Sequence, residues 1–158
     1  MTAYVSFLCG KVSEFFIPKS MRLLSSRGFE SDDFKVIMRT YVLVLDSLVF
    51  FPASCAAVKC AVRSAKDRLE LVNPATLMAL FQPVLILIDH GHYQYNCVCL
   101  GLAIFSIAAI SNNDVILGSI LFCLSLNFKQ IALYYSPALF FYLLHWCTDD
   151  YRAGLRLF

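Results

Sequence analysis

The chain has 158 residues, of which 59% are hydrophobic and 15% are charged, and its formal net charge is +2. A soluble domain has about 45–50% apolar and about 25% charged residues, so this composition favours an integral membrane protein. The small net charge and the lack of a basic patch argue against a nucleic-acid-binding protein. The seven cysteines are an odd number and form no C-x-x-C pair, which argues against a disulfide framework or a zinc ribbon.

Residues 3–17 are predicted to form an amphipathic helix that lies in the membrane interface. Apolar residues recur there at spacings of three and four, and Pro18 ends the segment. The segment is short and carries charges, so we do not expect it to span the bilayer. The polar residues 18–35 are predicted to form a loop on the luminal side, and Ser31 can cap the following helix.

The rest of the chain contains five apolar runs that we predict to be membrane spans. The first run includes Asp46, which would cost about 2.5–3.5 kcal/mol at the bilayer centre. Asp46 should therefore face a protein interior or a wet cavity, either in a structural ion pair or backbone hydrogen bond or in a functional role. Pro52 and Pro83 are expected to bend the first and second spans. The predicted spans are approximately residues 36–58, 74–90, 97–111, 115–126 and 131–147.

Charge asymmetry gives the predicted orientation of these spans. Lys59, Arg63, Lys66 and Arg68 directly follow the first span, and such basic clusters mark the cytosolic side. The first span then runs from lumen to cytosol, and the later spans alternate. The third and fourth runs are shorter than usual. They are either short spans in a thinned membrane or one broken helical hairpin, and alternation favours spans.

Two polar clusters end apolar runs on the predicted luminal face. The first covers residues 89–96 and the second covers residues 127–130. One up-and-down pair of helices separates them, so we expect them to be neighbours. They contain a carboxylate, two imidazoles, amides, an ammonium group and aromatic rings, which suit a pocket for a sugar and its phosphate.

Other chemistries have weaker support. Asp89, His90 and His92 could bind a metal, but residues adjacent in sequence diverge on a helix, and we expect no metal. The two histidines could also be ordinary interfacial side chains. His145 stands alone in an aromatic helix and is expected to be structural. A Ser–His–Asp hydrolase has no support, because the sequence contains no nucleophile elbow.

The segment Leu85–Asn96 closely resembles the His-aromatic-Gln-Tyr-Asn motif of the dolichyl-phosphate-glucose glucosyltransferases of the endoplasmic reticulum. Residues 127–130, with Leu133 and Tyr134, resemble the Asn-aromatic-Lys-Gln segment of that family. Weaker markers occur at residues 2–4, 26–31 and 38–40, so the resemblance covers nearly the whole chain. Gly91 before His92, together with Lys129 and Gln130, looks nearer to the enzyme that adds the first glucose than to its sister that adds the second.

The resemblance implies an all-α, polytopic membrane protein with part of a GT-C helix bundle, in the endoplasmic reticulum membrane. It implies transfer of glucose from dolichyl-phosphate glucose to the dolichyl-pyrophosphate-linked nine-mannose oligosaccharide during N-glycan precursor assembly. The displacement would be inverting and would need neither metal nor cofactor. The candidate donor-binding residues are Asp89, His90, His92, Gln94, Tyr95, Asn96, Lys129 and Gln130.

The chain departs from the family at its beginning. Family members have a further transmembrane helix and a luminal loop whose acidic motif provides the general base, followed by Asp-Tyr-Pro-Pro, and none of this precedes Met1. We therefore expect a fragment that is inactive alone, with the base that deprotonates the acceptor lying upstream. The alternative is a small non-catalytic polytopic membrane protein, such as a transporter component or an assembly factor, in which Asp46 and the polar helix ends line a path or an interface.

Overall fold

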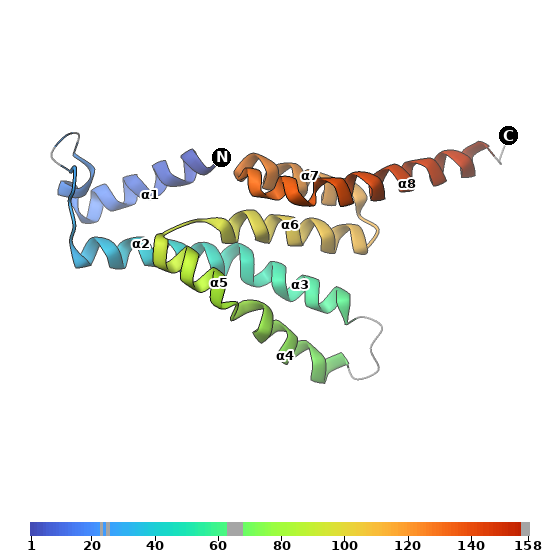
Figure 1. Ribbon diagram of the computed structural model, residues 1–158, viewed down its shortest axis with the longest axis horizontal. Helices are drawn as coiled ribbons and strands as arrows, with labels where there is room; N and C mark the ends of the chain where they lie inside the picture. Colours follow the sequence, from blue (N-terminus) through green and yellow to red (C-terminus); the bar gives the residue numbers. More distant parts are fainter. Residues whose placement is uncertain (23, 25, 63–67, 156–158) are drawn as a thin grey trace.

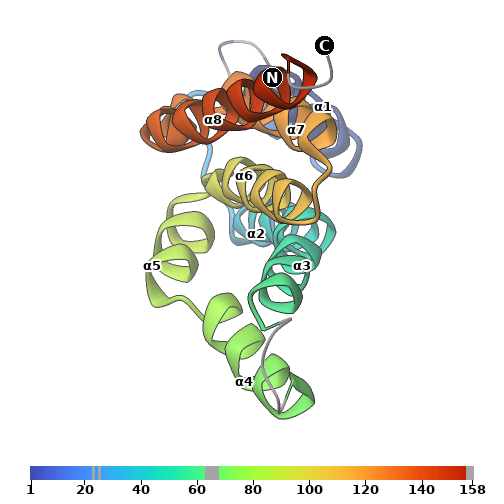
Figure 2. The ribbon, with the colours of Figure 1, turned by 90° about the vertical axis from the view of Figure 1, so that its right-hand side faces the viewer.

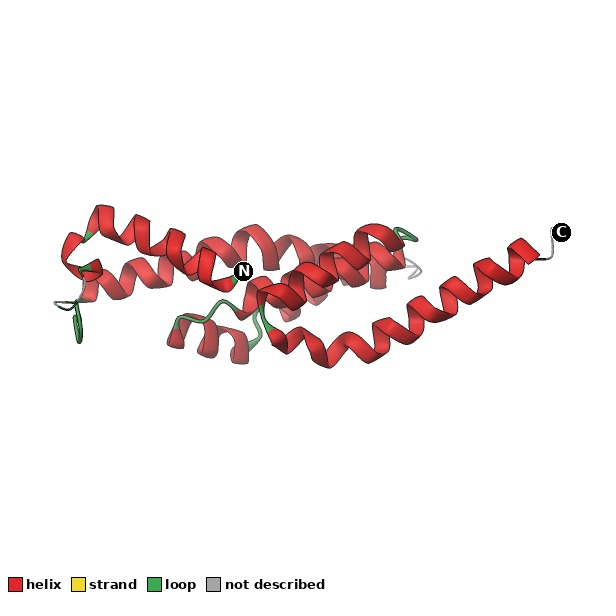
Figure 3. Ribbon diagram, turned by 90° about the horizontal axis from the view of Figure 1, so that it is seen from above, coloured by secondary structure: helices red, strands yellow, loops and turns green. Residues whose placement is uncertain are grey.

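The computed structural model describes residues 1–22, 24, 26–62 and 68–155. Within these ranges every regular element is a helix, which confirms the predicted all-α class (Figure 3). In chain order the elements are α1 (Thr2–Phe16), the 3-10 helix η1 (Pro18–Met21), α2 (Asp32–Leu45), the π-helical turn η2 (Asp46–Phe50), α3 (Phe51–Ala61), α4 (Arg68–Leu80), α5 (Pro83–Leu85), the π-helical turn η3 (Ile86–His90), α6 (Asn96–Ser111), α7 (Val115–Phe128), the 3-10 helix η4 (Gln130–Tyr135) and α8 (Ser136–Leu155).

Helices α2, η2 and α3 form one continuous helix, Asp32–Ala61. Among the described residues it is the one helix long and apolar enough to cross a membrane. It begins as the sequence predicts, because the Ser31 hydroxyl accepts a hydrogen bond of 3.2 Å from the amide of Phe34. The π turn η2 lies directly before Pro52, whose ring nitrogen cannot donate to the preceding turn. The structure thus shows a widened helical turn before Pro52, and the bend expected there stays a prediction.

The chain returns through α4, α5 and η3, and this segment is interrupted where Pro83 was expected to bend it. Gln82 is extended (ψ 111°), as the residue before a proline prefers to be. Helix α4 begins at Arg68, so Pro74 lies inside the helix and does not start it. Of the basic cluster used to orient the first span, Arg63 and Lys66 lie outside the described residues.

Helix α6 lies in the middle of the molecule, between α3 on one side and α7 on the other (Figure 2). It runs antiparallel to α7, and two buried serines connect the pair. Ser106 Oγ donates to the carbonyl of Gly118 over 2.6 Å, and Ser125 Oγ donates to the carbonyl of Cys99 over 2.7 Å. The third and fourth predicted runs are thus two packed helices. Both belong to the shorter apolar helices, and their crossing of a membrane stays a prediction.

The last predicted span starts as the 3-10 helix η4, and only from Ser136 does it continue as α8, which projects away from the other helices (Figure 3). At the other end of the chain, α1 lies near the end of α7. The Met1 ammonium donates to the carbonyl of Asn127 over 3.1 Å, and the Thr2 hydroxyl donates to the carbonyl of Phe128. Farther along α1, the hydroxyl groups of Ser13 and Tyr41 are 2.9 Å apart.

One apolar cluster holds together the end of the molecule that carries the polar segments. It brings together η2, the first turn of α6, the end of α7 and η4. Because the polar segments are attached directly to these elements, the cluster fixes their relative positions. Its buried members are Phe50, Cys97, Val98, Cys99, Phe128 and Ala132.

Candidate functional site

Asp89 organises the first polar segment from a buried position. Its side chain is 1% exposed although it carries a carboxylate. One oxygen accepts a hydrogen bond of 2.7 Å from the amide group of Asn96, and the other accepts a bond of 2.7 Å from the backbone N–H of Cys97. These donors belong to the first turn of α6, where an anion is favoured by the exposed N–H groups and by the helix dipole. Asp89 therefore fixes the start of α6 against the end of η3.

The two polar segments lie side by side, as the sequence predicted. The Lys129 ammonium donates to the Asn96 side-chain oxygen and, over 3.3 Å, to the Gln94 side-chain oxygen. The Gln94 oxygen also accepts from the Asn96 amide group over 3.1 Å. In the described part of the chain, the hydrogen-bond partners of this ammonium group are thus amide oxygens and not carboxylates. Its positive charge remains available to an anion.

Gln130 and His92 lie at the exposed edge of this arrangement. Gln130 follows Lys129 as the first residue of η4, and it borders a groove with Ile131, Leu133, Tyr134 and Pro137. His92 is exposed in the connection of residues 91–95 between η3 and α6, which we call the site loop, although its first two residues, 91 and 92, are still helical. Both side chains can reach a ligand at the surface, whereas Asp89 lies beneath it.

Two tyrosines shape the site loop. Tyr93 has a positive φ of 55°, which is rare for a bulky side chain and often marks a functional loop. Tyr95 is half-buried beside Cys9 of α1. Burial, reinforced by the Cys9 thiol, raises the pKa of Tyr95 to about 12. The Tyr95 hydroxyl thus has the Cys9 thiol as a hydrogen-bond partner, which ties the site loop to α1.

His90 does not point into the same network as the other candidates. Its Nε2 atom lies 2.8 Å from a carboxylate oxygen of Asp46, and both side chains are about three-quarters buried, with exposed fractions of 23% and 25%. The pair joins η3 to η2. The sequence indicated that Asp46 needs a polar partner, and His90 is such a partner, which the sequence did not identify.

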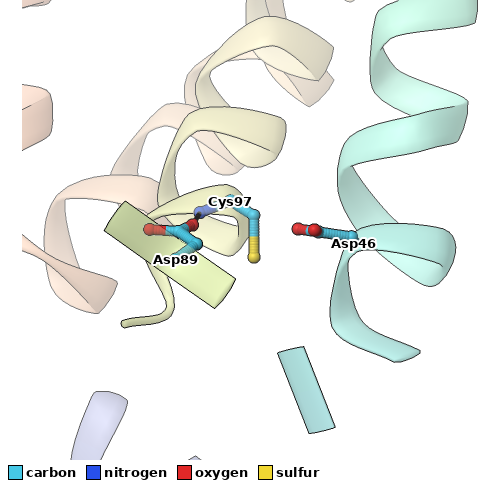
Figure 4. A group of neighbouring side chains, drawn as sticks. All are labelled: Asp46, Asp89 and Cys97. Carbon is cyan, nitrogen blue, oxygen red and sulfur yellow. Dashed lines mark hydrogen bonds between the residues drawn. The ribbon is translucent and has the colours of Figure 1, made fainter. Parts of the chain in front are cut away.

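The two buried or half-buried carboxylates of the site, Asp46 and Asp89, lie close together. Asp46, Asp89 and Cys97 each offer a possible ligand atom, and these atoms lie within 4.8 Å of one another. Figure 4 shows the Cys97 side chain between the two carboxylates. These three residues differ from the set Asp89, His90 and His92, which the sequence offered as possible metal ligands. The Asp89 oxygens already accept hydrogen bonds from Asn96 and Cys97, so the arrangement fits a packed junction between three helical segments.

Comparison with known proteins gives the family context. The model of the ALG6, ALG8 glycosyltransferase family matches residues 1–156. A probable dolichyl pyrophosphate Man9GlcNAc2 alpha-1,3-glucosyltransferase of Dictyostelium discoideum is 47% identical over 144 residues, which are 91% of this chain and 27% of that protein. The dolichyl pyrophosphate Man9GlcNAc2 alpha-1,3-glucosyltransferase of Gallus gallus is 42% identical over 156 residues, covering 99% of this chain and 30% of that protein. The Saccharomyces cerevisiae protein of the same name is 42% identical over 146 residues, covering 91% and 27%. The chain thus spans less than a third of the length of these relatives.

Proposed function

Because the chain belongs to the ALG6, ALG8 glycosyltransferase family, we propose that it forms part of an α-1,3-glucosyltransferase that acts on dolichyl pyrophosphate Man9GlcNAc2. The donor is dolichyl-phosphate glucose. The protein works in the endoplasmic reticulum membrane as a multi-pass protein with a GT-C helix bundle, and the described helices contribute part of that bundle. The site loop and Lys129 face the lumen.

The observation that supports this function most directly is the ammonium group of Lys129. It projects from the extended residue that ends α7, and the amide oxygens of Gln94 and Asn96 hold it in place. A lysine whose partners are neutral keeps its full charge for a phosphate. Gln130 follows Lys129 in the chain and His92 is exposed nearby in the sequence of the first polar segment, and their side chains offer donors and acceptors that suit sugar hydroxyl groups.

This arrangement suits the leaving group of the reaction. Transfer breaks the bond between the anomeric carbon of glucose and the phosphate oxygen, and forms a bond from that carbon to an acceptor hydroxyl oxygen. Negative charge then grows on the departing dolichyl phosphate, and a fixed ammonium group stabilises that charge more in the transition state than in the ground state. The hydroxyl proton goes to a general base, a role that we assign to no residue of this chain.

Donor binding is tested by replacing Lys129 in the complete protein. Lys129→Gln removes the charge, and we expect it to raise the KM for dolichyl-phosphate glucose by at least about tenfold. Lys129→Arg keeps the charge and should retain part of the activity. The assay measures glucose transfer to dolichyl pyrophosphate Man9GlcNAc2 in isolated membranes.

The matched control is Lys59→Gln, which removes an exposed lysine from the last turn of α3, at the opposite end of the helices (Figure 1). This variant should transfer glucose normally. A Lys129→Gln protein with an unchanged donor KM would refute the proposed site, and an intact protein that transfers no glucose would refute the proposed activity.

A further inference from the structure

We propose that Asp46 is a positioning residue for the donor site, and that it acts through His90 on the site loop and Lys129. The inference rests on the proposed function, because it concerns the donor site named there. Asp46 belongs to the first membrane-spanning candidate, and its side chain does not contact Lys129 or Gln94 in any described hydrogen bond. Its effect on the donor must therefore be transmitted.

The first step is the contact between Asp46 and His90. The 2.8 Å separation and the exposed fractions of 25% and 23% describe a hydrogen-bonded pair that is largely withdrawn from solvent. The second oxygen of Asp46 is buried, and the Cys97 thiol is the other polar neighbour of this carboxylate among the described residues. A carboxylate in such surroundings is costly unless its contacts are kept, so the pair restrains both elements strongly.

The second step is the backbone geometry on both sides of the pair. Asp46 is the first residue of the π turn η2, and His90 is the last residue of the π turn η3. In the described chain these are the two π-helical turns, and the pair joins them. Such turns are rare and occur often at functional sites. Each of these two π turns carries one member of the pair, Asp46 in η2 and His90 in η3.

The third step leads from His90 to the donor site. His90 directly follows Asp89, so a displacement of η3 moves the carboxylate that holds Asn96 and the amide of Cys97. Asn96 in turn accepts from Lys129. The path from Asp46 to the ammonium group therefore consists of hydrogen bonds and one peptide link.

The test is Asp46→Ala in the complete protein, with the KM values for donor and acceptor measured separately. If the pair keeps the donor site in its binding conformation, its loss lowers the populated fraction of that conformation and raises the apparent KM for dolichyl-phosphate glucose in proportion. We expect an increase of about tenfold for the donor and less than about twofold for the oligosaccharide acceptor. His90→Ala should have the same effect, and the double variant should be no worse than either single variant.

Hydrogen exchange provides a readout that does not need catalysis. The amide of Gln94 donates to the carbonyl of Asp89, and the amide of Cys97 donates to its carboxylate. We expect both to exchange faster in Asp46→Ala. Ser47→Ala is the matched control, because the Ser47 hydroxyl donates to Leu43 within the same helix, and neither the donor KM nor the exchange should change.

Each outcome decides between positioning and simple structural support. A lower maximal rate with an unchanged donor KM would show that Asp46 only stabilises the protein, and would overturn the inference. Unchanged exchange would also overturn it, even where Lys129→Gln supports the proposed donor site. A wild-type protein that transfers no glucose refutes the proposed function instead, whatever the exchange shows. If Asp46→Ala does not fold, Asp46→Asn, which keeps an oxygen for the imidazole N–H, should raise the donor KM by about threefold.

Discussion

Asp89 shows how a single buried carboxylate can place a surface site. Asp89 became a donor-binding candidate because it belongs to the polar cluster of residues 89–96 that resembles the family motif. In the structure its oxygens accept from Asn96 and from the Cys97 amide, and its side chain is almost fully buried. Whether it touches the donor stays a prediction, but its hydrogen bonds already give it a role in holding Asn96 beneath Lys129.

Asp89→Asn should therefore destabilise the protein rather than only weaken substrate binding. An asparagine keeps the shape but turns an N–H₂ group toward one of the two donors, which leaves that donor buried and unpaired. We expect a loss of about 1–3 kcal/mol in the free energy of unfolding. Thermal unfolding of the complete protein in detergent measures this loss. Asp33→Asn, at an exposed position in the first turn of α2, should cost less than about 1 kcal/mol. Equal losses would contradict the bridging role of Asp89.

At the scale of elements, the packing of α6 against η2 depends on one glycine. A Cβ atom on Gly101 would lie 2.9 Å from Val49 Cγ1 and 3.2 Å from the backbone of Phe50. The side chain of Val49 can move, but the backbone of Phe50 can yield only if the helices separate. Because Phe50 belongs to the same π turn as Asp46, the spacing of these helices also affects the pair with His90.

Gly101→Ala should consequently lower the free energy of unfolding by about 1–3 kcal/mol, because the added methyl group overfills the contact. The measurement is the thermal midpoint of the complete protein. Gly91→Ala is the matched control, since a Cβ there would meet nothing within 4 Å. A Gly101→Ala protein as stable as the control would show that α6 and η2 are not tightly packed.

The elements that the sequence predicted correctly are those with local causes. Pro18 ends α1, the Ser31 hydroxyl starts α2, and Pro83 interrupts the second run, each through the geometry of its own neighbourhood. Local patterns also predicted that the two polar segments would be neighbours, because one pair of antiparallel helices returns the chain to the same end. The partner of Asp46 could not be predicted in this way. A carboxylate in an apolar run indicates that a partner is needed, but the choice of His90 depends on how η2 and η3 pack.

The same limit applies to Asp89 and to the last helix. The sequence made Asp89 a donor-binding candidate without indicating its burial, and the position of the first turn of α6 above it explains that burial. The apolar run from residue 131 onward predicted one helix, whereas the structure begins it as 3-10 and changes to α at Ser136. Hydrophobic patterning does not distinguish these two helix types.

At the scale of the whole molecule, exposed apolar side chains are spread along several helices, for example Phe15 on α1, Ile116 on α7 and Phe140 on α8. Large exposed apolar surfaces of this kind suit contact with lipid or with further helices. The continuous helix Asp32–Ala61 has 30 residues, about 45 Å at 1.5 Å per residue, which exceeds the hydrocarbon thickness of about 30 Å. Helix α6, with 16 residues, reaches only about 24 Å.

The short length of α6 separates the two models of the hairpin α6–α7. If α6 crosses the membrane, the bilayer must thin around it, at a cost of fractions of a kcal/mol for each ångström of mismatch. The site loop then lies in the lumen and the turn at residues 112–114 lies in the cytosol. If the two helices form a re-entrant hairpin, the site loop is still luminal, but the turn is enclosed within the membrane.

A pair of insertions distinguishes the models. These 158 residues contain no Asn-x-Ser/Thr acceptor, so a flexible linker carrying one acceptor adds the one site in this part of the protein, and a glycan in excess of the parent protein's is attached to the linker. Placed in the site loop of the complete protein, the linker should receive a glycan, because glycan transfer to asparagine takes place in the lumen. A linker with a protease site between Asn113 and Asp114 should remain unglycosylated and should be cut by protease added to sealed microsomes. Protection of this second linker would contradict the crossing of α6, and lack of a glycan on the first would contradict a luminal donor site.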